Sequence, residues 1–111
     1  DLKLLKEKQE LLIKLLIFVD EKFYKIKVNN SLSPIGWHLL HCLYIECIWI
    51  RSYFLNDDSL VNKLKSDADG VNIPTKDRGL NLPSFKNLIN FCKSEFEKNL
   101  IIVEDNYLKS I

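Results

Sequence analysis

The two histidines of the chain, His38 and His41, are three residues apart, and histidine is the side chain whose ordinary pKa lies nearest neutrality. Residues three or four apart share one face of a helix, so both imidazoles and the thiol of Cys42 are candidate metal ligands. A closed metal site needs ligands from a second segment, and the remaining sequence offers scattered carboxylates and Cys92. The pattern predicts a partial metal site. The alternative interpretation is two core histidines with satisfied ring nitrogens.

Nucleophilic catalysis is a weaker prediction. Cys42 lies one turn from His38, but an apolar helix raises the pKa of a thiol and lowers its reactivity. The three glycines stand apart from one another, so no phosphate-binding loop is predicted. Glu46 is the most unusual residue, because an unpaired carboxylate in an apolar helix costs several kcal/mol. We expect it to meet an Arg, a His or a helix end, with Arg78 as one candidate.

A helix predicted over 34–55 positions these residues. Ser33 is a typical N-cap, and Pro34 suits the first helical position because it lacks an N–H. The helix is apolar nearly all round, which predicts burial and requires its polar groups to be paired or functional. Residues at helical spacing share the side that carries the histidines: Trp37, His38, His41, Tyr44, Ile45 and Ile48.

Two more long helices are predicted, over 2–28 and 84–104, the second with Ser84 as its N-cap. Between them, a short helix capped by Asp57 or Asp58 ends near Asp69–Gly70. An ordered loop follows, with four apolar residues expected to fix it to the core: Val71, Ile73, Leu80 and Leu82. Three amphipathic helices leave a groove that a fourth usually closes. We therefore predict an all-α single domain over 1–111, an up-down bundle without its fourth helix.

Composition narrows the class of protein. The 111 residues are 47% hydrophobic and 28% charged with a net charge of +1, so no basic footprint for nucleic acid is present. The longest uncharged run, Val28–Ile45, contains several polar residues and Pro34, and its apolar part, Ile35–Ile45, is too short to span a bilayer. Three cysteines without CxxC spacing indicate reduced thiols and a cytoplasmic location, and Cys42 and Cys47 point to different sides of their helix. The absence of methionine suggests a piece of a longer chain.

The segment SPIGWHLLHCLYIECIW resembles the second helix of DinB-like bundle domains fused to formylglycine-generating-enzyme-like domains. These fusions are non-haem iron sulfoxide synthases of the ergothioneine and selenoneine type. Their helix carries a pattern close to SPxxWHLGH followed by a Glu, and here Leu40 replaces the usual Gly. The loop before the third predicted helix also resembles the segment that leads into the third helix of this family. The resemblance is weaker in the first and third helices. Residues matching the family pattern are Ser33, Pro34, Trp37, His38, Leu39, His41, Glu46, Pro74, Arg78, Leu82 and Pro83.

The resemblance implies that His41 binds ferrous iron together with an HxxxH pair on a fourth helix. The iron of that family activates oxygen to join a thiol sulfur to a histidine-derived imidazole. This sequence has no HxxxH and no second domain, so His41 is the single ligand that carries over. His38 is a family feature to which no role is assigned. We expect this chain alone to be inactive and to bind iron or zinc weakly or not at all.

Two further functions remain open beside the amino-terminal part of such an oxygenase. One is a non-catalytic helical interaction module, and the other is a DinB-like metal-dependent hydrolase or thiol transferase. The parent gene would separate them, because HxxxH and a second domain support the oxygenase. The expected partners are the missing carboxy-terminal part or a second copy, with no nucleic acid and no membrane. They should cover a groove beside His41 lined by Trp37, Tyr44 and Ile48.

Overall fold

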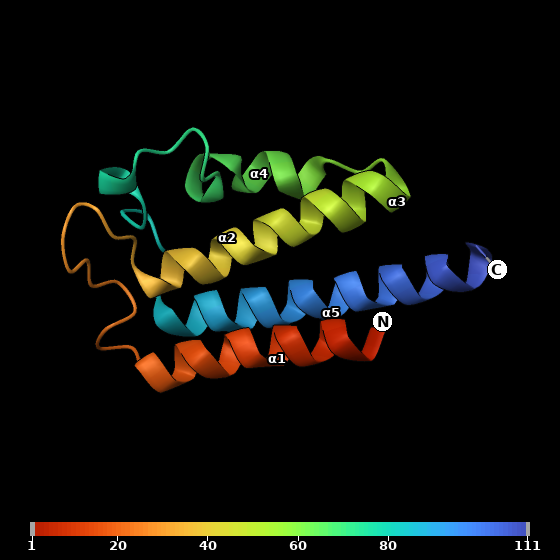
Figure 1. The fold of residues 1–111 in the computed structure, drawn as a ribbon, viewed down its shortest axis with the longest axis horizontal. Helices are drawn as coiled ribbons and strands as arrows, with labels where there is room; N and C mark the ends of the chain where they lie inside the picture. Colours follow the sequence, from red (N-terminus) through yellow and green to blue (C-terminus); the bar gives the residue numbers. More distant parts are fainter. Residues whose placement is uncertain (1, 111) are drawn as a thin grey trace.

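The computed structural model describes residues 2–110, with side chains as far as residue 106. Within this range all regular structure is helical and no strand is present, so the predicted all-α class is confirmed. Figure 1 shows long helices lying side by side, with the loops between them gathered mainly at one end. Helix α1 lies on one flank, α4 lies on the other, and α2 and α5 are between them.

Helix α1 (Leu2–Val19) is shorter than the helix predicted over 2–28. It ends where Asp20 adopts a left-handed backbone with φ of 77°, while its N–H still donates to the Leu16 carbonyl at 3.0 Å. The Asp20 carboxylate accepts a hydrogen bond from the Glu21 N–H at 2.7 Å. Aspartate tolerates this conformation better than most residues, so the helix stops without Gly or Pro. Apolar spacing alone did not reveal this end.

The central helix has the extent predicted but differs in two details. Helix α2 (Ile35–Cys47) begins one residue later than expected, because Pro34 has an extended backbone with ψ of 150° and is itself the N-cap. The predicted side-chain cap from Ser33 is wrong, since no side chain caps this end. A π-helical turn over Ile48–Ser52 then joins α2 to a last short turn, α3 (Tyr53–Leu55). Asn56, with φ of 50°, ends the run.

The segment after α3 forms helix α4 (Ser59–Ala68), a loop with a 3-10 turn at Thr75–Asp77, and helix α5 (Phe85–Ser110). The predicted short helix is confirmed, but the side chain of its N-cap residue, Asp58, makes no capping bond, and Asp57 accepts from the Ser59 N–H at 3.0 Å. The Ser84 hydroxyl caps α5 by accepting from the Asn87 N–H at 3.3 Å, also as predicted. Helix α5 continues past the predicted end at residue 104.

The connecting loop is fixed to the core at fewer points than predicted. Leu82 is buried and Ile73 is half-buried, but Val71 and Leu80 are 91% and 69% exposed. At Gly79 the backbone has a positive φ of 84°, and the glycine lies directly against the Pro34 ring. The loop therefore closes over the start of α2.

Successive helices alternate in direction, as in the predicted up-down order, but the short helix α4 is a fourth member where none was expected. Helices α2 and α5 run parallel, and α1 is antiparallel to both (Figure 1). The start of α2 packs beside the start of α5, where Tyr24 donates its hydroxyl to the Pro83 carbonyl at 2.8 Å and Gly36 lies against Leu82. Helix α4 returns the chain along α2, and this return allows α5 to repeat the direction of α2.

The core lies among α1, α2 and α5, with α4 packed on the outer side of α2. It is built from apolar side chains of every major helix, and its most deeply buried members are Leu16, Trp37, Leu43, Cys47, Leu88 and Cys92. The prediction that the central helix is buried all round is wrong, because α2 exposes His38 and Ile45, and the π-helical turn exposes Trp49. In contrast, Trp37 and Tyr44, which were expected to be left uncovered, are buried, and α4 packs along α2.

Candidate metal-ligand site at His41

His41 is held in a defined orientation by the end of α4. Its Nδ1 lies 2.7 Å from the backbone oxygen of Ala68, the last residue of that helix. Carbonyl oxygens in the last turn of a helix have no intrahelical donor, so this one is available. A carbonyl oxygen only accepts hydrogen bonds, and Nδ1 must therefore carry the proton. In the neutral ring, Nε2 is then left with a free lone pair, which is the form that binds a metal.

The His41 ring is also fixed by stacking. It lies nearly parallel to the Trp37 indole, with 4.7 Å between the ring centroids and 10° between the planes. Trp37 is in turn anchored, because its indole N–H donates to the Asp67 carbonyl at 3.0 Å. Helix α4 thus fixes the orientation of the His41 ring in two ways. The Ala68 carbonyl contacts the ring directly, and the Asp67 carbonyl holds the Trp37 indole on which the ring stacks.

Arg78 closes the loop beside these rings. Its guanidinium lies 4.6 Å from the Trp37 ring centroid, and it donates to the carbonyls of Ile73 at 3.0 Å and Gly70 at 2.7 Å. These contacts hold the loop that follows α4 against the start of α2. The expected partnership of Arg78 with Glu46 is wrong, because the side chain turns to the loop instead.

These groups line an open pocket of about 510 Å³ formed by Trp37, His38, His41, Ile45, Asp69, Gly70, Val71 and Arg78. Gly70 lies so close to His41 that an added Cβ would be 3.0 Å from the imidazole Cε1. His38 is exposed at the rim, and partial desolvation, His41 and Arg78 lower the pKa of its ring. The structure therefore brings the two predicted histidines to one pocket but fixes only His41.

The pocket does not form a complete metal site by itself. Within residues 2–110, no group of three His, Cys, Asp or Glu side chains is placed to hold a metal ion. Asp69 lines the pocket, but its carboxylate accepts from the Val71 N–H at 2.9 Å and from the Asn72 amide at 2.6 Å. The geometry leaves Nε2 of His41 as the ring nitrogen without a hydrogen-bond partner among these contacts.

Glu46 is satisfied by a polar cluster inside the bundle. Its carboxylate accepts from the Gln9 amide at 3.1 and 3.0 Å and from the Asn99 amide at 2.7 Å. Burial raises the pKa of this carboxyl, while the bonds from Asn99 and Gln9 and the charge of Arg51 oppose the rise. The cluster joins α1, α2 and α5 at one level.

Arg51 extends the same cluster toward α5. It donates through Nε to the Asn99 carbonyl oxygen at 2.8 Å and forms an ion pair with Glu95 at 2.6 Å. Arg51 belongs to the π-helical turn, and turns of this kind are often found at functional sites. Its side chain is only 12% exposed, so the turn directs a cation into the bundle.

The sequence contained a signal for part of this cluster. Gln9 occupies a buried position of α1 among leucines and isoleucine, and Asn99 follows Cys92 and Phe96 at helical spacing on α5. Two amides on the apolar faces of separate helices indicate a buried acceptor between them. Their partnership with Glu46 required the packing of the three helices.

The predicted rise in the pKa of the Cys42 thiol is present, and it extends to the other two cysteines. Cys42, Cys47 and Cys92 are all free, and burial raises the pKa of each. For Cys92 the pKa rises to about 12, so the thiolate that nucleophilic catalysis needs is not formed at neutral pH.

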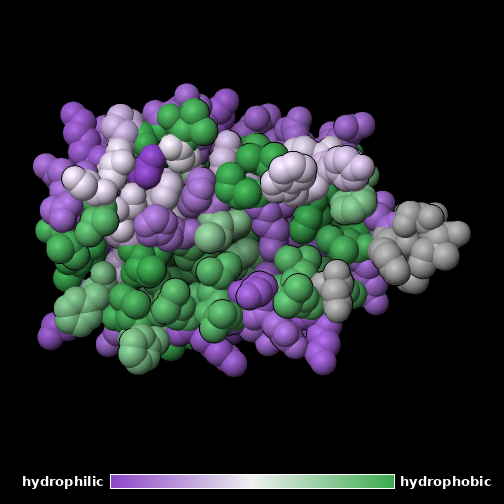
Figure 2. Space-filling model, in the orientation of Figure 1, coloured by the Kyte–Doolittle hydropathy of each residue, from purple (hydrophilic) through white to green (hydrophobic). Residues whose placement is uncertain are grey.

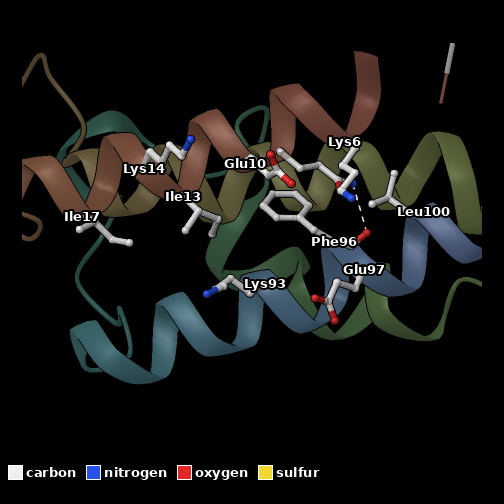
Figure 3. A pocket seen from close by; sticks show the side chains of 10 residues that line it. Lys6, Glu10, Ile13, Lys14, Ile17, Lys93, Phe96, Glu97 and Leu100 are labelled. Atoms are coloured by element: carbon white, nitrogen blue, oxygen red, sulfur yellow. Dashed lines mark hydrogen bonds between the residues drawn. The ribbon is translucent and has the colours of Figure 1, made fainter. Parts of the chain in front are cut away.

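A second pocket lies between α1 and α5, away from the histidines, with a volume of about 410 Å³ (Figure 3). Figure 3 shows Ile13 and Phe96 along its floor, with Lys14, Lys93 and Glu97 at its edges. Gln9 donates to the Phe96 carbonyl at 3.2 Å at one end. The mixed charges of this pocket define no ligand class.

Searches of protein-family models, curated proteins and solved structures find no match for this chain. Among the helices of residues 2–110, none combines the length and apolar character that crossing a bilayer requires.

Proposed function

We propose that this chain is the amino-terminal, DinB-like part of a non-haem iron enzyme that uses oxygen to form a carbon–sulfur bond, and that His41 provides one of its metal ligands. The family part of this proposal rests on the likeness of the α2 segment to the sulfoxide synthase pattern. The single structural observation that supports it is the 2.7 Å contact between His41 Nδ1 and the Ala68 carbonyl.

This contact supports a ligand role for a chemical reason. Histidines that bind metals usually donate their second ring N–H to a carbonyl or carboxylate, which fixes the tautomer and makes the ligating nitrogen more basic. His41 has this arrangement before any metal is bound, and its ring faces a pocket open to the outside. His38, at the rim of the same pocket, is the natural comparison within the chain because its ring has no such carbonyl contact among the bonds of the described residues.

The other residues of the pocket have supporting roles in this proposal. Trp37 sets the plane of the His41 ring, and Arg78 keeps the loop after α4 closed behind it. Ferrous iron, when bound, would supply the oxygen activation. Its further ligands and the substrate pocket belong to the rest of the parent enzyme, which we place in the cytoplasm together with these reduced thiols.

The test uses the whole protein encoded by the parent gene, loaded anaerobically with ferrous iron and freed of unbound metal. We expect His41→Ala to lose most of its iron and the matched His38→Ala variant to keep most of it. Equal retention by both variants would contradict the ligand role of His41. Oxygen uptake on addition of a thiol and a histidine derivative then tests the substrate class separately.

A second candidate function is a non-catalytic helical interaction module. The exposed apolar side chains on the outer face of α1 favour it, because such surfaces mark contacts with other proteins. In this case the iron measurement gives no retained metal in any variant, including the wild type.

A further inference from the structure

Helix α1 carries a second apolar stripe that plays no part in the core. Its members follow helical spacing and are largely exposed: Leu4 (52%), Leu11 (59%), Leu15 (46%) and Phe18 (86%). The helix is 18 residues long, so the stripe extends over most of about 27 Å. Figure 2 shows hydrophobic side chains gathered over the middle and lower part of the molecule, where α2, α5 and α1 lie in Figure 1.

The stripe faces away from the core. Leu11 and Leu15 each lie two positions after a buried residue, Gln9 and Ile13, and Phe18 likewise follows the buried Leu16. Two residues turn a helix through about 200°, so the stripe and the buried face are on opposite sides. Most surface helices of a globular protein have one apolar face, and α1 has two.

The stripe is large for an exposed surface. These four side chains expose on the order of 400 Å² of apolar area, a scale at which a patch marks an interaction site. Ile45 on α2 and Trp49 on the π-helical turn, which are 38% and 70% exposed, add further apolar area to the molecular surface.

We propose that the stripe is a dimer interface, on which α1 of a second copy packs antiparallel with the two-fold axis at Leu11. Leu4 and Phe18 are each seven positions away from Leu11 and share its face of the helix, whereas the mirror position of Leu15 is Glu7. In an antiparallel pair, Leu4 of one copy therefore meets Phe18 of the other, and the two Leu11 side chains meet at the centre.

The charges beside the stripe favour this occupant and this direction. Glu7 and Lys14 lie on the same edge of the stripe, one on each side of Leu11. The two-fold axis brings Glu7 of each copy beside Lys14 of the other, which gives two attractive pairs. A parallel pair in register would instead place this edge against the opposite edge of the partner's stripe, so Glu7 would not meet Lys14.

The area is sufficient for a stable pair. Both stripes together bury on the order of 800 Å², and the flanking charged side chains bring the total to about 1,200 Å², the lower end for specific interfaces. The proposal does not depend on the metal-ligand role of His41, since the stripe contains none of the residues that line the histidine pocket.

The first test is the mass of the chain in solution, by sedimentation equilibrium at micromolar concentration. We expect a dimer, and we expect Leu11→Asp to raise the dissociation constant by about 100-fold because two carboxylates then meet at the axis. Ile101→Asp is the matched control, because Ile101 on α5 is 57% exposed and lies off the stripe. Circular dichroism confirms that both variants keep their helices. A monomeric wild type, or a dimer insensitive to Leu11→Asp, would overturn the proposal.

The second test is a charge exchange that identifies the arrangement. Glu7→Lys and Lys14→Glu should each weaken the dimer, because each single change produces like-charged neighbours across the axis. The double variant should recover the wild-type dissociation constant within a few fold. Failure of the double variant to recover would contradict the antiparallel register.

Discussion

At the scale of single residues, His41 and Glu46 show how the same helix holds two polar groups in different ways. His41 is fixed by a backbone carbonyl and a stacked ring at the edge of a pocket. Glu46 is enclosed by the amides of Gln9 and Asn99, with Arg51 nearby. The first arrangement leaves a ring nitrogen free for a ligand, whereas the second uses the carboxylate to join three helices.

The raised pKa of Glu46 predicts a pH dependence of stability. The folded chain holds this proton to higher pH than the unfolded chain does, so between the two pKa values it binds more protons. The contribution of Glu46 to the free energy of unfolding is therefore greatest at low pH and falls as pH rises through that window. Urea unfolding of wild type and Glu46→Gln across acidic to neutral pH measures this as their difference.

Two features make the comparison specific. Arg51 lowers the pKa of Glu95, which has the opposite pH dependence, but that effect is present in both proteins and cancels. Glu10→Gln on the exposed side of α1 is the control and should show no comparable slope. The account requires the free energy of unfolding of wild type minus that of Glu46→Gln to fall as pH rises. If this value stays constant or rises with pH, the account is contradicted.

At the scale of elements, the chain ends and bends its helices at residues that periodicity does not detect. The helix over 2–28 was predicted too long because Phe23 and Ile26 continue the apolar spacing beyond Asp20, although both are about half exposed. The π-helical turn at Ile48–Ser52 is likewise invisible in an apolar run. Capping signals worked better where a polar side chain follows a loop, as at Ser84.

A substitution at Gly79 tests whether the connecting loop depends on its contact with the start of α2. The φ of 84° at Gly79 disfavours any side chain, and an added Cβ would lie 2.6 Å from the Pro34 ring at the start of α2. We expect Gly79→Ala to lower the free energy of unfolding by roughly 1–2 kcal/mol through this strain and clash. Urea unfolding measures the change.

The adjacent Leu80→Ala variant is the control for Gly79, since Leu80 is 69% exposed and its loss should change stability by less than about 0.5 kcal/mol. Equal stabilities of Gly79→Ala and wild type would show that the loop does not depend on this contact.

At the scale of the whole molecule, the sequence predicted the helical class and the three long helices, because these follow from local spacing and punctuation. It did not predict that α2 and α5 run parallel, which depends on the return of α4 along α2. The sequence identified His38 and His41 as candidate metal ligands from their residue type and spacing. Their unequal roles were not predicted, because the carbonyl that distinguishes them comes from Ala68, 27 residues further along the chain.

The distribution of apolar surface was also beyond the sequence. A leucine-rich α1 is compatible with one broad buried face, and only the packing shows which leucines remain outside. Trp37 and Tyr44, which were expected to line an uncovered groove, are buried, and the exposed apolar side chains include Leu11 and Phe18 on α1 and Trp49 on the π-helical turn. The interface proposed for α1 follows from this redistribution.

The central claim is that the neutral His41 ring carries its proton on Nδ1, which leaves Nε2 free to bind a metal, and long-range nitrogen–proton NMR of the two histidines tests it most directly. The account predicts the Nδ1–H tautomer for His41 at a pH where the ring is neutral. It also predicts that Mn²⁺, bound weakly by this single chain, broadens His41 more than His38. An Nε2–H tautomer at His41, or broadening confined to His38, would contradict the account.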